Sequence, residues 1–421
     1  MILCFEDVRL IDPEAGTETR GRLVVEHGVI AQVNGAAPRS GERIDGGGLA
    51  LAPGLIDIGV KVGEPGERHK EGFRSAGRSA AAGGVTTIVT RPDTTPALDA
   101  PEGLAFARAR AAERCGVRVR QIAALTKGRD GREMTEIGFL KDSGAVAFSD
   151  GDRVVPTGVL ARAMRYAADL GCLVIAHPQE PDLSGGHVTS GAFATLRGLS
   201  GVPPIAERMG LERDLALAEM TGCRYHADQV TTAEGAETVR RAKARGLDVT
   251  AGTSIHHVTL NALDVGDWRT FFKVKPPLRA EDDRRATVEA LLDGTIDTLS
   301  SFHTPQDEES KRLPFEAAAS GAVGLETLLP AALRLLHGGL CSLADLVRVM
   351  ALNPARRLGL DAGRLAEGAP ADLILIDENA PFVLDRFALL SKSKNTPFDG
   401  ARMQGRVRGT WVGGQRVFPE G

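Results

Sequence analysis

The chain has 421 residues, of which 43% are hydrophobic and 25% are charged. This length and composition are typical of a globular protein with one large domain and a smaller one, or with two to three ordinary domains. The formal net charge of −4 gives no indication of a polyanionic partner, so nucleic-acid binding is not expected. No apolar run approaches the roughly 18 residues that a membrane-spanning helix needs, so no membrane association is expected either.

The five cysteines are odd in number, scattered along the chain and never spaced as C-x-x-C. This usage argues against a disulfide framework or a zinc ribbon, and it favours a reducing compartment. We therefore expect a cytoplasmic protein.

Both ends of the chain have the texture of short strands separated by Gly-rich turns. The first residues include "ILCFEDVRLID" and "RGRLVVEHGVIAQV", and the last include "ADLILIDENA" and "GRVRGTWVGGQRVF". Alternating apolar and polar residues of this kind indicate half-buried β-strands. The sequence predicts a small composite β-sandwich domain built from residues 1–52 and 367–421.

Between these ends, short apolar runs alternate with Ala-, Arg- and Glu-rich helical stretches. There are eight such runs: "GLIDIGVKV", "GVTTIVTR", "VRVRQIAALT", "GAVAFSD", "GCLVIAHP", "CRYHADQV", "GLDVTAGTS" and "GTIDTLSSF". Eight buried strands that alternate with helices are the signature of a (β/α)8 TIM barrel, predicted here over residues 53–366. A doubly wound open sheet is the alternative, but no Gly-rich dinucleotide motif follows the first run.

In such barrels the chemistry lies at the carboxyl ends of the strands. The residues that close the runs include Lys61, Arg91, Asp150, His177 and Gln229. One long connection, from Gln179 to about Arg208, is predicted to be a functional flap or a partner-binding surface because loops of this length are uncommon inside compact domains.

The strand ends resemble those of the dihydroorotase family, within the cyclic amidohydrolases. "PGLIDIGVKVGEPGERHKE" resembles the family's P-G-x-I-D-x-H-x-H-x-R-E-P-G opening, and "AAAGGVTTIVTRPDTTPALD" is similar to its G-G-x-T-T and P-N-T-x-P segments. Further matches follow in the expected order, in "FSDGD", "VIAHPQE", "VTAGTSIHHVTL", "KVKPPLR", "GLETLLP" and "SKSKNTPF". The resemblance therefore runs through the barrel and the tail.

The resemblance implies a metal-dependent hydrolase that interconverts carbamoyl-aspartate and dihydroorotate, with one or two zinc ions at the barrel mouth. The family's ligands are the two histidines of H-x-H, a bridging acid after strand four, and histidines after strands five and six. An acid after strand eight moves the proton of the attacking water. Carried onto this chain, two ligand positions survive, as Asp150 and His177.

The other positions do not survive. The H-x-H histidines fall on Gly59 and Lys61, the strand-six histidine falls on Gln229, and the proton-moving acid falls on Phe302. A catalytic zinc needs three protein ligands and a water, and Lys61 adds a repelling charge. We therefore expect no intact catalytic residue and no resident metal, with at most weak ion binding at Asp150 and His177.

The family's substrate pocket is altered as well. The arginine that grips the substrate carboxylate falls on Gly63, and the asparagine of P-N-T falls on Asp93, whose charge would repel that carboxylate. Lys61, Arg91 and His257 remain as further pocket residues. A lysine elsewhere does not replace a bidentate arginine.

Several residues have two interpretations. His303 is the best remaining candidate for residual acid–base chemistry. Lys61 is expected to fill the space left by the metal and to pair with Asp150. His69, His226 and the His256–His257 pair are interpreted as structural, although the pair also lies near the barrel mouth.

Three functions remain open. The first, favoured by the simultaneous losses, is an inactive structural or regulatory subunit that assembles with aspartate carbamoyltransferase, as noncatalytic dihydroorotase-like chains do. The second is a surviving or altered cyclic amidohydrolase that uses one ion on Asp150, His177 and His303. The third is a metal-free sensor in which Lys61 and Arg91 bind an anion. A homo- or hetero-oligomer is expected in the first case.

Overall fold

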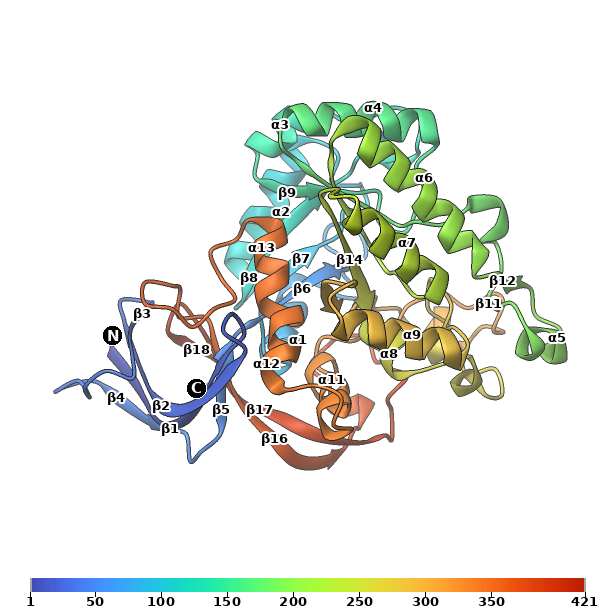
Figure 1. The fold of residues 1–421 in the computed structure, drawn as a ribbon. Coiled ribbons are helices and arrows are strands. Elements are labelled where there is room, and N and C mark those ends of the chain that lie inside the picture. The colour runs from blue at the N-terminus through green and yellow to red at the C-terminus, as the bar shows by residue number, and fades with distance from the viewer. Residues whose placement is uncertain (1, 420–421) are drawn as a thin grey trace.

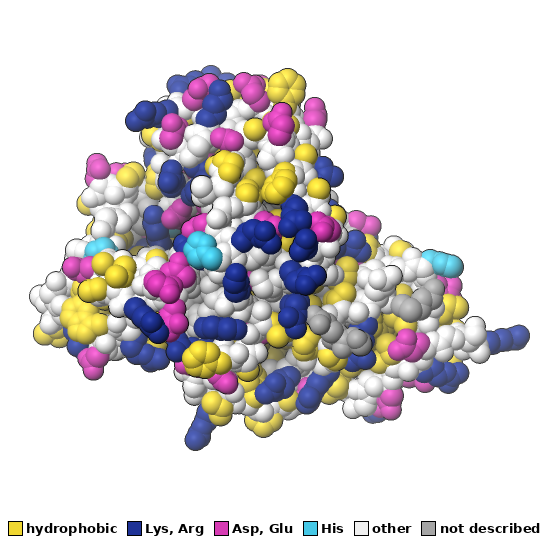
Figure 2. All heavy atoms as spheres, turned by 180° about the vertical axis from the view of Figure 1, so that it is seen from behind, with side chains coloured by type: hydrophobic (Ala, Val, Ile, Leu, Met, Phe, Trp, Pro, Cys, Tyr) yellow, Lys and Arg dark blue, Asp and Glu magenta, His cyan; other side chains and the backbone are white. Residues whose placement is uncertain are grey.

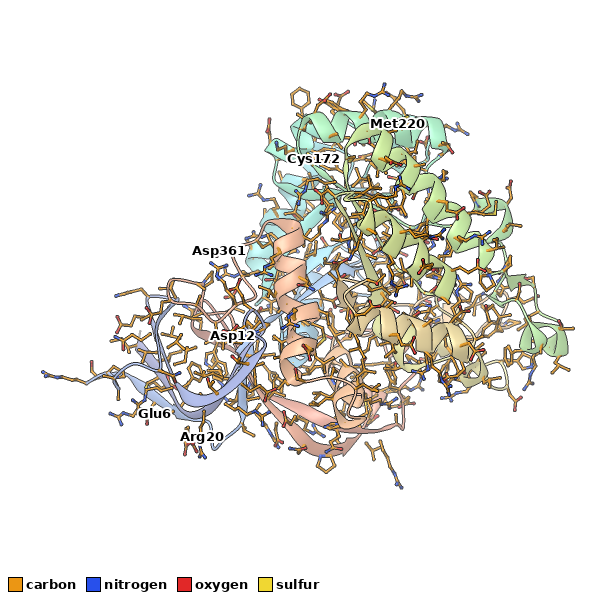
Figure 3. All side chains as sticks on the ribbon, in the orientation of Figure 1. Glu6, Asp12, Arg20, Cys172, Met220 and Asp361 are labelled. Atoms are coloured by element: carbon orange, nitrogen blue, oxygen red, sulfur yellow. The ribbon has the colours of Figure 1, made fainter. Side chains whose placement is uncertain are left out.

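A (β/α)8 barrel and a separate β-sheet unit make up the protein, whose computed structural model describes residues 2–419 (Figure 1). Figure 3 places Cys172 and Met220 at one end of the barrel, and Glu6 and Arg20 on the sheet unit at the other. The predicted (β/α)8 barrel is thus confirmed.

Each of the eight predicted runs forms one strand of the barrel. These strands are β6 (Leu55–Val60), β7 (Val85–Thr90), β8 (Arg118–Ala123), β9 (Ala145–Phe148), β10 (Leu173–Ala176), β13 (Arg224–Ala227), β14 (Val249–Ser254) and β15 (Thr298–Ser300). They lie side by side in chain order, and every pairing is parallel. Most of their residues are buried, as expected for strands covered by helices on the outside.

The barrel closes where β6 meets β15. The Lys61 backbone N–H donates to the His303 carbonyl at 2.8 Å, just beyond the ends of the two strands. Deeper in the barrel, Asp57 Oδ1 accepts a hydrogen bond from the Ser301 N–H at 2.9 Å. The closure therefore lies next to the residues that occupy the family's H-x-H and acid positions.

Helices cover the outside of the strands and extend beyond the last one. They include α1 (Phe73–Ala82), α2 (Pro101–Arg114), α3 (Ile137–Asp142), α4 (Thr157–Asp169), α6 (Ile205–Thr221), α7 (Ala233–Ala244), α8 (Ile255–Thr259), α9 (Glu281–Leu292), α10 (Glu308–Arg312), α11 (Leu328–His337), α12 (Leu343–Val347) and α13 (Asn353–Leu358). Their inner faces are rich in alanine, which brings a helix close to the strands; α1 buries Ala76, Ala80 and Ala81. None of the helices in the described residues is both long and apolar enough to span a membrane.

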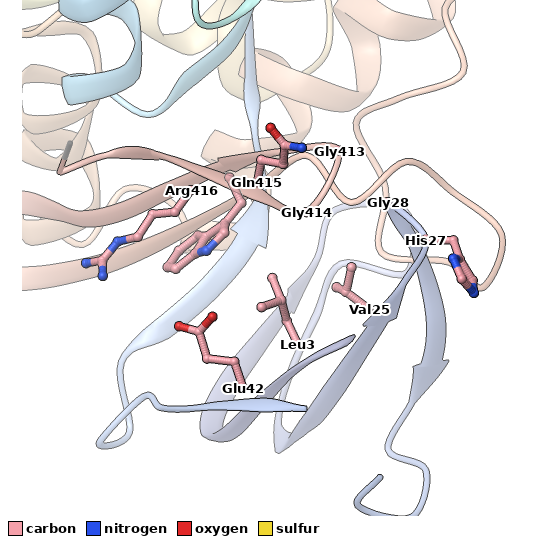
Figure 4. A pocket seen from close by; sticks show the side chains of 10 residues that line it. Leu3, Val25, His27, Gly28, Glu42, Gly413, Gly414, Gln415 and Arg416 are labelled. Atoms are coloured by element: carbon pink, nitrogen blue, oxygen red, sulfur yellow. The ribbon is translucent and has the colours of Figure 1, made fainter. Parts of the chain in front are cut away.

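Strands from both ends of the chain form the second unit. They are β1 (Ile2–Asp12), β2 (Thr17–Glu26), β3 (Val29–Val33), β4 (Glu42–Asp45) and β5 (Ala50–Pro53), with β16 (Leu373–Val383), β17 (Arg402–Val412) and β18 (Gln415–Phe418). The antiparallel pairing of β5 with β16 joins the two groups into one hydrogen-bonded sheet. This sheet has its own core, which includes Phe5 packed edge-on against Trp411 at 4.9 Å. A hollow of about 470 Å³ lies between its N- and C-terminal strands, and Figure 4 shows the side chains that line it.

The long connection after β10 is partly ordered into regular structure. It contains the strands β11 (Val188–Thr189) and β12 (Gly201–Val202), which pair in parallel, and the helix α5 (Ala192–Arg197) between them. Leu196 on α5 is 83% exposed, so this segment projects from the barrel and does not fill it (Figure 1).

The barrel and the sheet unit are joined by a paired charge. Arg118, at the start of β8, donates from Nε and Nη2 to the two carboxylate oxygens of Asp372 at 2.6 and 3.0 Å. Asp372 Oδ1 also accepts from the Gly413 N–H at 2.7 Å. One buried carboxylate therefore holds the barrel strand and the C-terminal hairpin together.

Replacing Asp372 tests this link. Asp372→Ala leaves the Arg118 guanidinium and the Gly413 N–H without their acceptor, so we expect the free energy of unfolding to fall by about 1–3 kcal/mol. The measurement is urea denaturation. Glu219→Ala is the control, because it removes an exposed ion pair with Arg245 and should change stability by less than about 1 kcal/mol. Equal losses in the two variants would contradict the prediction.

Candidate functional site

Gly59 and Phe302 are in contact at the barrel mouth. A Cβ atom built on Gly59 would lie 3.0 Å from Phe302 Cε1, and Gly59 has φ +90°, a conformation that favours glycine. Phe302 is 6% exposed and itself has φ +46°. The aromatic ring therefore lies where the first H-x-H side chain would have to begin.

Lys61 is held by two carboxylates. Its Nζ lies 3.0 Å from Glu67 Oε2 and 3.6 Å from Asp93 Oδ2, and its side chain is only 15% exposed. Partial burial acts to raise the pKa of Glu67, but Lys70 and Lys61 outweigh it and lower that pKa. The predicted pairing of Lys61 with Asp150 is wrong, because the loop after β6 brings Glu67 to the ammonium instead.

Asp93 is also paired with Arg91. The Arg91 guanidinium donates from Nη2 and Nε to the two oxygens of Asp93 at 2.5 and 3.3 Å, and both side chains are buried. Burial alone would raise the pKa of Asp93, but Arg91 and Lys61 outweigh it and hold the pKa below its usual value. Both cations that the anion-sensor hypothesis requires are thus engaged with carboxylates of the chain itself.

Gly63 lies in a tight turn. A Cβ atom there would lie 2.3 Å from the Glu67 carbonyl oxygen, and the Gly63 carbonyl accepts from the Glu67 N–H at 2.6 Å. An arginine at Gly63 would require the backbone of this turn to move. The turn that leaves no room for the family's arginine at Gly63 also brings Glu67 to Lys61.

Asp150 is satisfied by its own neighbours. Its Oδ1 accepts from the backbone N–H groups of Leu125 and Thr126, each at 2.9 Å, and its Oδ2 accepts from the Thr126 hydroxyl. Burial raises the pKa of Asp150, and these hydrogen bonds only partly oppose that rise. The arrangement ties the end of β9 to the end of β8.

His177 is the one surviving ligand position without a hydrogen-bond partner in the described residues. Both of its ring nitrogens are buried and unpaired. Burial and the nearby Lys275 ammonium lower the pKa of His177 to about 3, so the ring is neutral. Gln229, at the strand-six position, donates its amide to the Lys275 carbonyl at 3.2 Å. It is therefore engaged with the backbone.

His303 is held by its own neighbours. It is fully buried, its Nδ1 accepts from the Gly324 N–H at 3.2 Å, and its Nε2 lies 3.4 Å from Glu71 Oε2. Burial acts to raise the pKa of Glu71, but the nearby His303 and the hydrogen bonds from Ser391 and Ser75 outweigh it and lower that pKa. Among the described residues, no metal-binding group combines His303 with Asp150 and His177, as a one-ion hydrolase would require.

The other histidines occupy structural positions. His257 uses both ring nitrogens, on the Ser254 hydroxyl at 2.7 Å and the Pro276 carbonyl at 3.2 Å. His226 Nδ1 lies 2.8 Å from the Thr250 hydroxyl. The His256 ring packs against Phe398, while His69 is exposed beside Asp307.

Sequence reasoning missed several residues that shape this region. Glu67 and Glu71 lie in the quoted opening segment, where the acids between Gly63 and Gly72 were the available signal. Asp228, next to Gln229, is buried with one unpaired oxygen, and burial raises its pKa to about 7 against the influence of Arg91. Lys275 lies in the quoted segment "KVKPPLR", but its place beside His177 in one hollow depends on the loop after β14.

The residues present do not fit the family's zinc centre. Among residues 2–419, no group of three or more His, Cys, Asp or Glu side chains is arranged to hold a metal ion. A phenyl ring, an ion-paired ammonium and a backbone-bonded amide replace the missing donors. A hollow of about 360 Å³ does remain beside His177, lined also by Gln179, Arg129, Asp152 and Lys275.

The contact between Gly59 and Phe302 leads to a first prediction for this site. Gly59→Ala adds a Cβ at a left-handed φ and close to the ring, so we expect stability to fall by about 1–3 kcal/mol. In a Phe302→Ala background, Gly59→Ala should lower stability by less, because only the penalty for the left-handed φ remains. Urea denaturation measures the effect of Gly59→Ala in both backgrounds. Gly116→Ala, where a Cβ meets open space, is the control, and equal effects at Gly59 and Gly116 would refute the prediction.

The buried histidines lead to a second prediction. Burial lowers the pKa of His226 to about 3, so between pH 3 and about 6.5 the unfolded chain binds more protons than the folded one. Stability therefore falls as pH drops through that window. From pH 7.5 to pH 5, His226 lowers the free energy of unfolding by about 2 kcal/mol. His226→Asn should lessen the pH dependence of urea denaturation. His27→Asn, at an exposed histidine, should leave it unchanged; equal changes would contradict the assignment.

Comparison with known proteins gives consistent matches over the whole chain. The Dihydro-orotase-like family matches residues 48–235, and the Amidohydrolase family matches residues 320–418. A dihydroorotase of Anaeromyxobacter sp. (strain K) is 39% identical over 100% of this chain and 98% of its own length. A dihydroorotase of Bacillus caldolyticus is 40% identical over 96% of each chain.

Solved structures agree with these sequence matches. The L-hydantoinase (dihydropyrimidinase) from Arthrobacter aurescens has a TM-score of 0.90 and 26% identity, and the alignment covers 99% of this chain and 95% of that one. A D-hydantoinase structure with a TM-score of 0.87 and 21% identity shares the fold. Taken with the order of the strand-end segments and the barrel that carries them, these matches show that the chain belongs to the dihydroorotase family of amidohydrolases.

Proposed function

We propose that this chain is a noncatalytic member of its family that acts as a structural or regulatory subunit of an aspartate carbamoyltransferase complex in pyrimidine biosynthesis. The observation that carries the proposal is the Phe302 ring packed against Gly59. This contact occupies the place of one metal ligand with the residue that replaces the proton-moving acid. A complete barrel and sheet unit remain, which suits a role in assembly.

Hydrolysis of a cyclic amide needs a nucleophile that water alone does not supply at neutral pH. In the family a zinc ion lowers the pKa of its bound water to about 7, and it needs three protein ligands to do so. Here the Lys61 ammonium, between Glu67 and Asp93, already provides the positive charge that neutralises the local carboxylates. A second cation would be repelled, and Phe302 cannot accept a proton.

An altered cyclic amidohydrolase is the alternative that the relatives' names favour, since the two homologues described above are called dihydroorotases. Asp150 and His177 retain their family positions. Against this function, Asp150 already accepts three hydrogen bonds, and His303 lies against Glu71. A metal-free anion sensor would have to displace carboxylates of the chain itself, because Lys61 and Arg91 are paired. In the remaining hollow, Lys275 and Arg129 both contact Asp152.

The native mass of the purified full-length chain, alone and mixed with the same organism's aspartate carbamoyltransferase, tests the proposal. We expect a defined heavier complex, no stoichiometric zinc, and no dihydroorotate turnover above the uncatalysed rate. The matched variant Gly59→His/Lys61→His/Gln229→His/Phe302→Asp restores the donor types, and we expect it to bind more zinc than the natural chain if it folds.

Other outcomes separate the alternatives. Stoichiometric zinc and turnover by the natural chain would overturn the noncatalytic assignment in favour of the hydrolase. Saturable binding of a carboxylate metabolite without turnover or complex formation would favour the sensor. Failure of the two proteins to associate would reject the subunit role.

A further inference from the structure

Exposed hydrophobic side chains gather at one corner of the barrel rim, where the projecting segment that carries α5 meets two neighbouring loops. The loops are residues 262–272, after β14, and residues 308–315, after β15. The exposed side chains form what we call the rim patch: Leu196, Leu263, Trp268 and Leu313. Figure 2 shows the molecule from behind, with hydrophobic side chains on the lobe at the lower left, which carries α5 in Figure 1.

Side-chain contacts hold the three segments of this corner together. The Arg197 guanidinium, at the end of α5, lies 2.7 Å from Asp267 Oδ1 and also over the Phe193 ring, 5.8 Å from its centroid. The Trp268 ring packs edge-on against Phe315, with 6.3 Å between the ring centroids. The rim patch is therefore one surface built from neighbouring segments. An exposed hydrophobic surface of this kind marks an interaction site.

The structure exposes these side chains at a cost. Trp268 has φ +66°, which is unfavourable for a bulky residue, and it is still 41% exposed. Leu196 is 83% exposed and Leu263 is 71% exposed. Strained backbone of this kind tends to occur at functional positions. A second surface that covers the rim patch would bury the indole and both leucines.

The charges beside the rim patch favour a second copy of this chain as that surface. Arg197 adjoins Leu196 on the projecting segment, and Asp267 adjoins Trp268 on the loop, so opposite charges lie side by side between hydrophobic groups. In a two-fold symmetric dimer a surface meets itself in reverse order. Arg197 of each copy would then face Asp267 of the other. The Asp267 side chain is 87% exposed, which leaves room for a second guanidinium.

We propose that the rim patch is the contact surface of a two-fold homodimer of this chain. The inference goes beyond the proposed function, because it concerns association of the chain with itself and does not depend on the transferase. Burial of the hydrophobic side chains from both copies supplies the driving force. The alternating charges fix the orientation of the two copies. A strongly acidic or strongly basic partner would be repelled by one charge of the Arg197–Asp267 pair.

Two charge reversals and their mixture test the orientation. Arg197→Asp places two acids beside the rim patch and Asp267→Arg places two bases there, so each variant alone should dimerise about tenfold more weakly than the natural chain. Mixed in equal amounts, the two variants should form a heterodimer within about threefold of the natural affinity, because each contact again joins opposite charges. Sedimentation velocity gives the dissociation constants, and native mass spectrometry with one tagged chain identifies the heterodimer.

Recovery in the mixture is specific to contacts between chains. Within each variant chain the pair at positions 197 and 267 stays like-charged, so repair of the intrachain ion pair cannot produce it. Absence of recovery would overturn the reverse orientation that the proposal requires.

A second variant tests the hydrophobic contact. Leu196→Asp/Leu263→Asp places charges in the rim patch, and we expect it to be monomeric at concentrations where the natural chain is a dimer. Phe139→Asp/Leu340→Asp is the matched control, because it makes the same change at exposed hydrophobic residues outside the rim patch, and it should dimerise like the natural chain. Circular dichroism checks that all variants fold.

The outcomes for the homodimer and for the proposed function are distinct. A monomeric natural chain, or a Leu196→Asp/Leu263→Asp variant that dimerises like the natural chain, would overturn the homodimer. If the natural chain is monomeric and this variant alone loses binding to aspartate carbamoyltransferase, the rim patch is a contact for that partner instead. A dimer that behaves as expected while the transferase fails to bind would support the homodimer and reject only the subunit role.

Discussion

The join between β6 and β15 is the constraint on which the barrel mouth depends. The Lys61 N–H bonds the His303 carbonyl, and Asp57 bonds the Ser301 N–H one layer below, so the first and last strands are fixed in register. Asp57 is fully buried with one oxygen unpaired, and burial raises its pKa to about 6. In the family, the residues around this join carry chemistry. Here the same closure brings a phenyl ring onto a glycine, and packing replaces coordination.

A set of internal charges balances the mouth once coordination is gone. Glu67, Lys61, Asp93 and Arg91 alternate in sign and lie in contact in that order. Removing one member of a buried charge pair leaves the other unpaired, which is strongly unfavourable. The arrangement explains why a lysine is tolerated here, since Glu67 and Asp93 both lie against its ammonium. The unpaired, neutral His177 ring takes no part in this set of charges and lines the hollow of about 360 Å³.

The sequence was sufficient for the architecture because each barrel strand is a short apolar run, and each of the eight predicted runs contains one strand of the barrel. Which family positions are replaced could also be read from the segment order. The side chains that contact the replacing residues could not be predicted from the sequence. Lys61 pairs with Glu67 and not with Asp150, because the backbone turn at Gly63 brings the Glu67 carboxylate to the Lys61 ammonium. Likewise, the contact between Gly59 and Phe302 joins the first and last strands, and only closure of the barrel creates it. The terminal strands form one continuous sheet because β5 pairs with β16, which alternation alone does not reveal.

The paired positions Gly59 and Phe302 also bear on how such a chain can change. A histidine at Gly59 would meet both an unfavourable φ and the Phe302 ring. An acid at Phe302 alone would be buried, and the described residues offer no metal site to pair with it. Each single substitution toward the hydrolase therefore lowers stability before any activity can return. The loss of the metal site is therefore hard to reverse, because several residues would have to change at the same time. Substitutions at exposed positions of the outer helices and the sheet unit face no such barrier, so these positions are the most free to diverge.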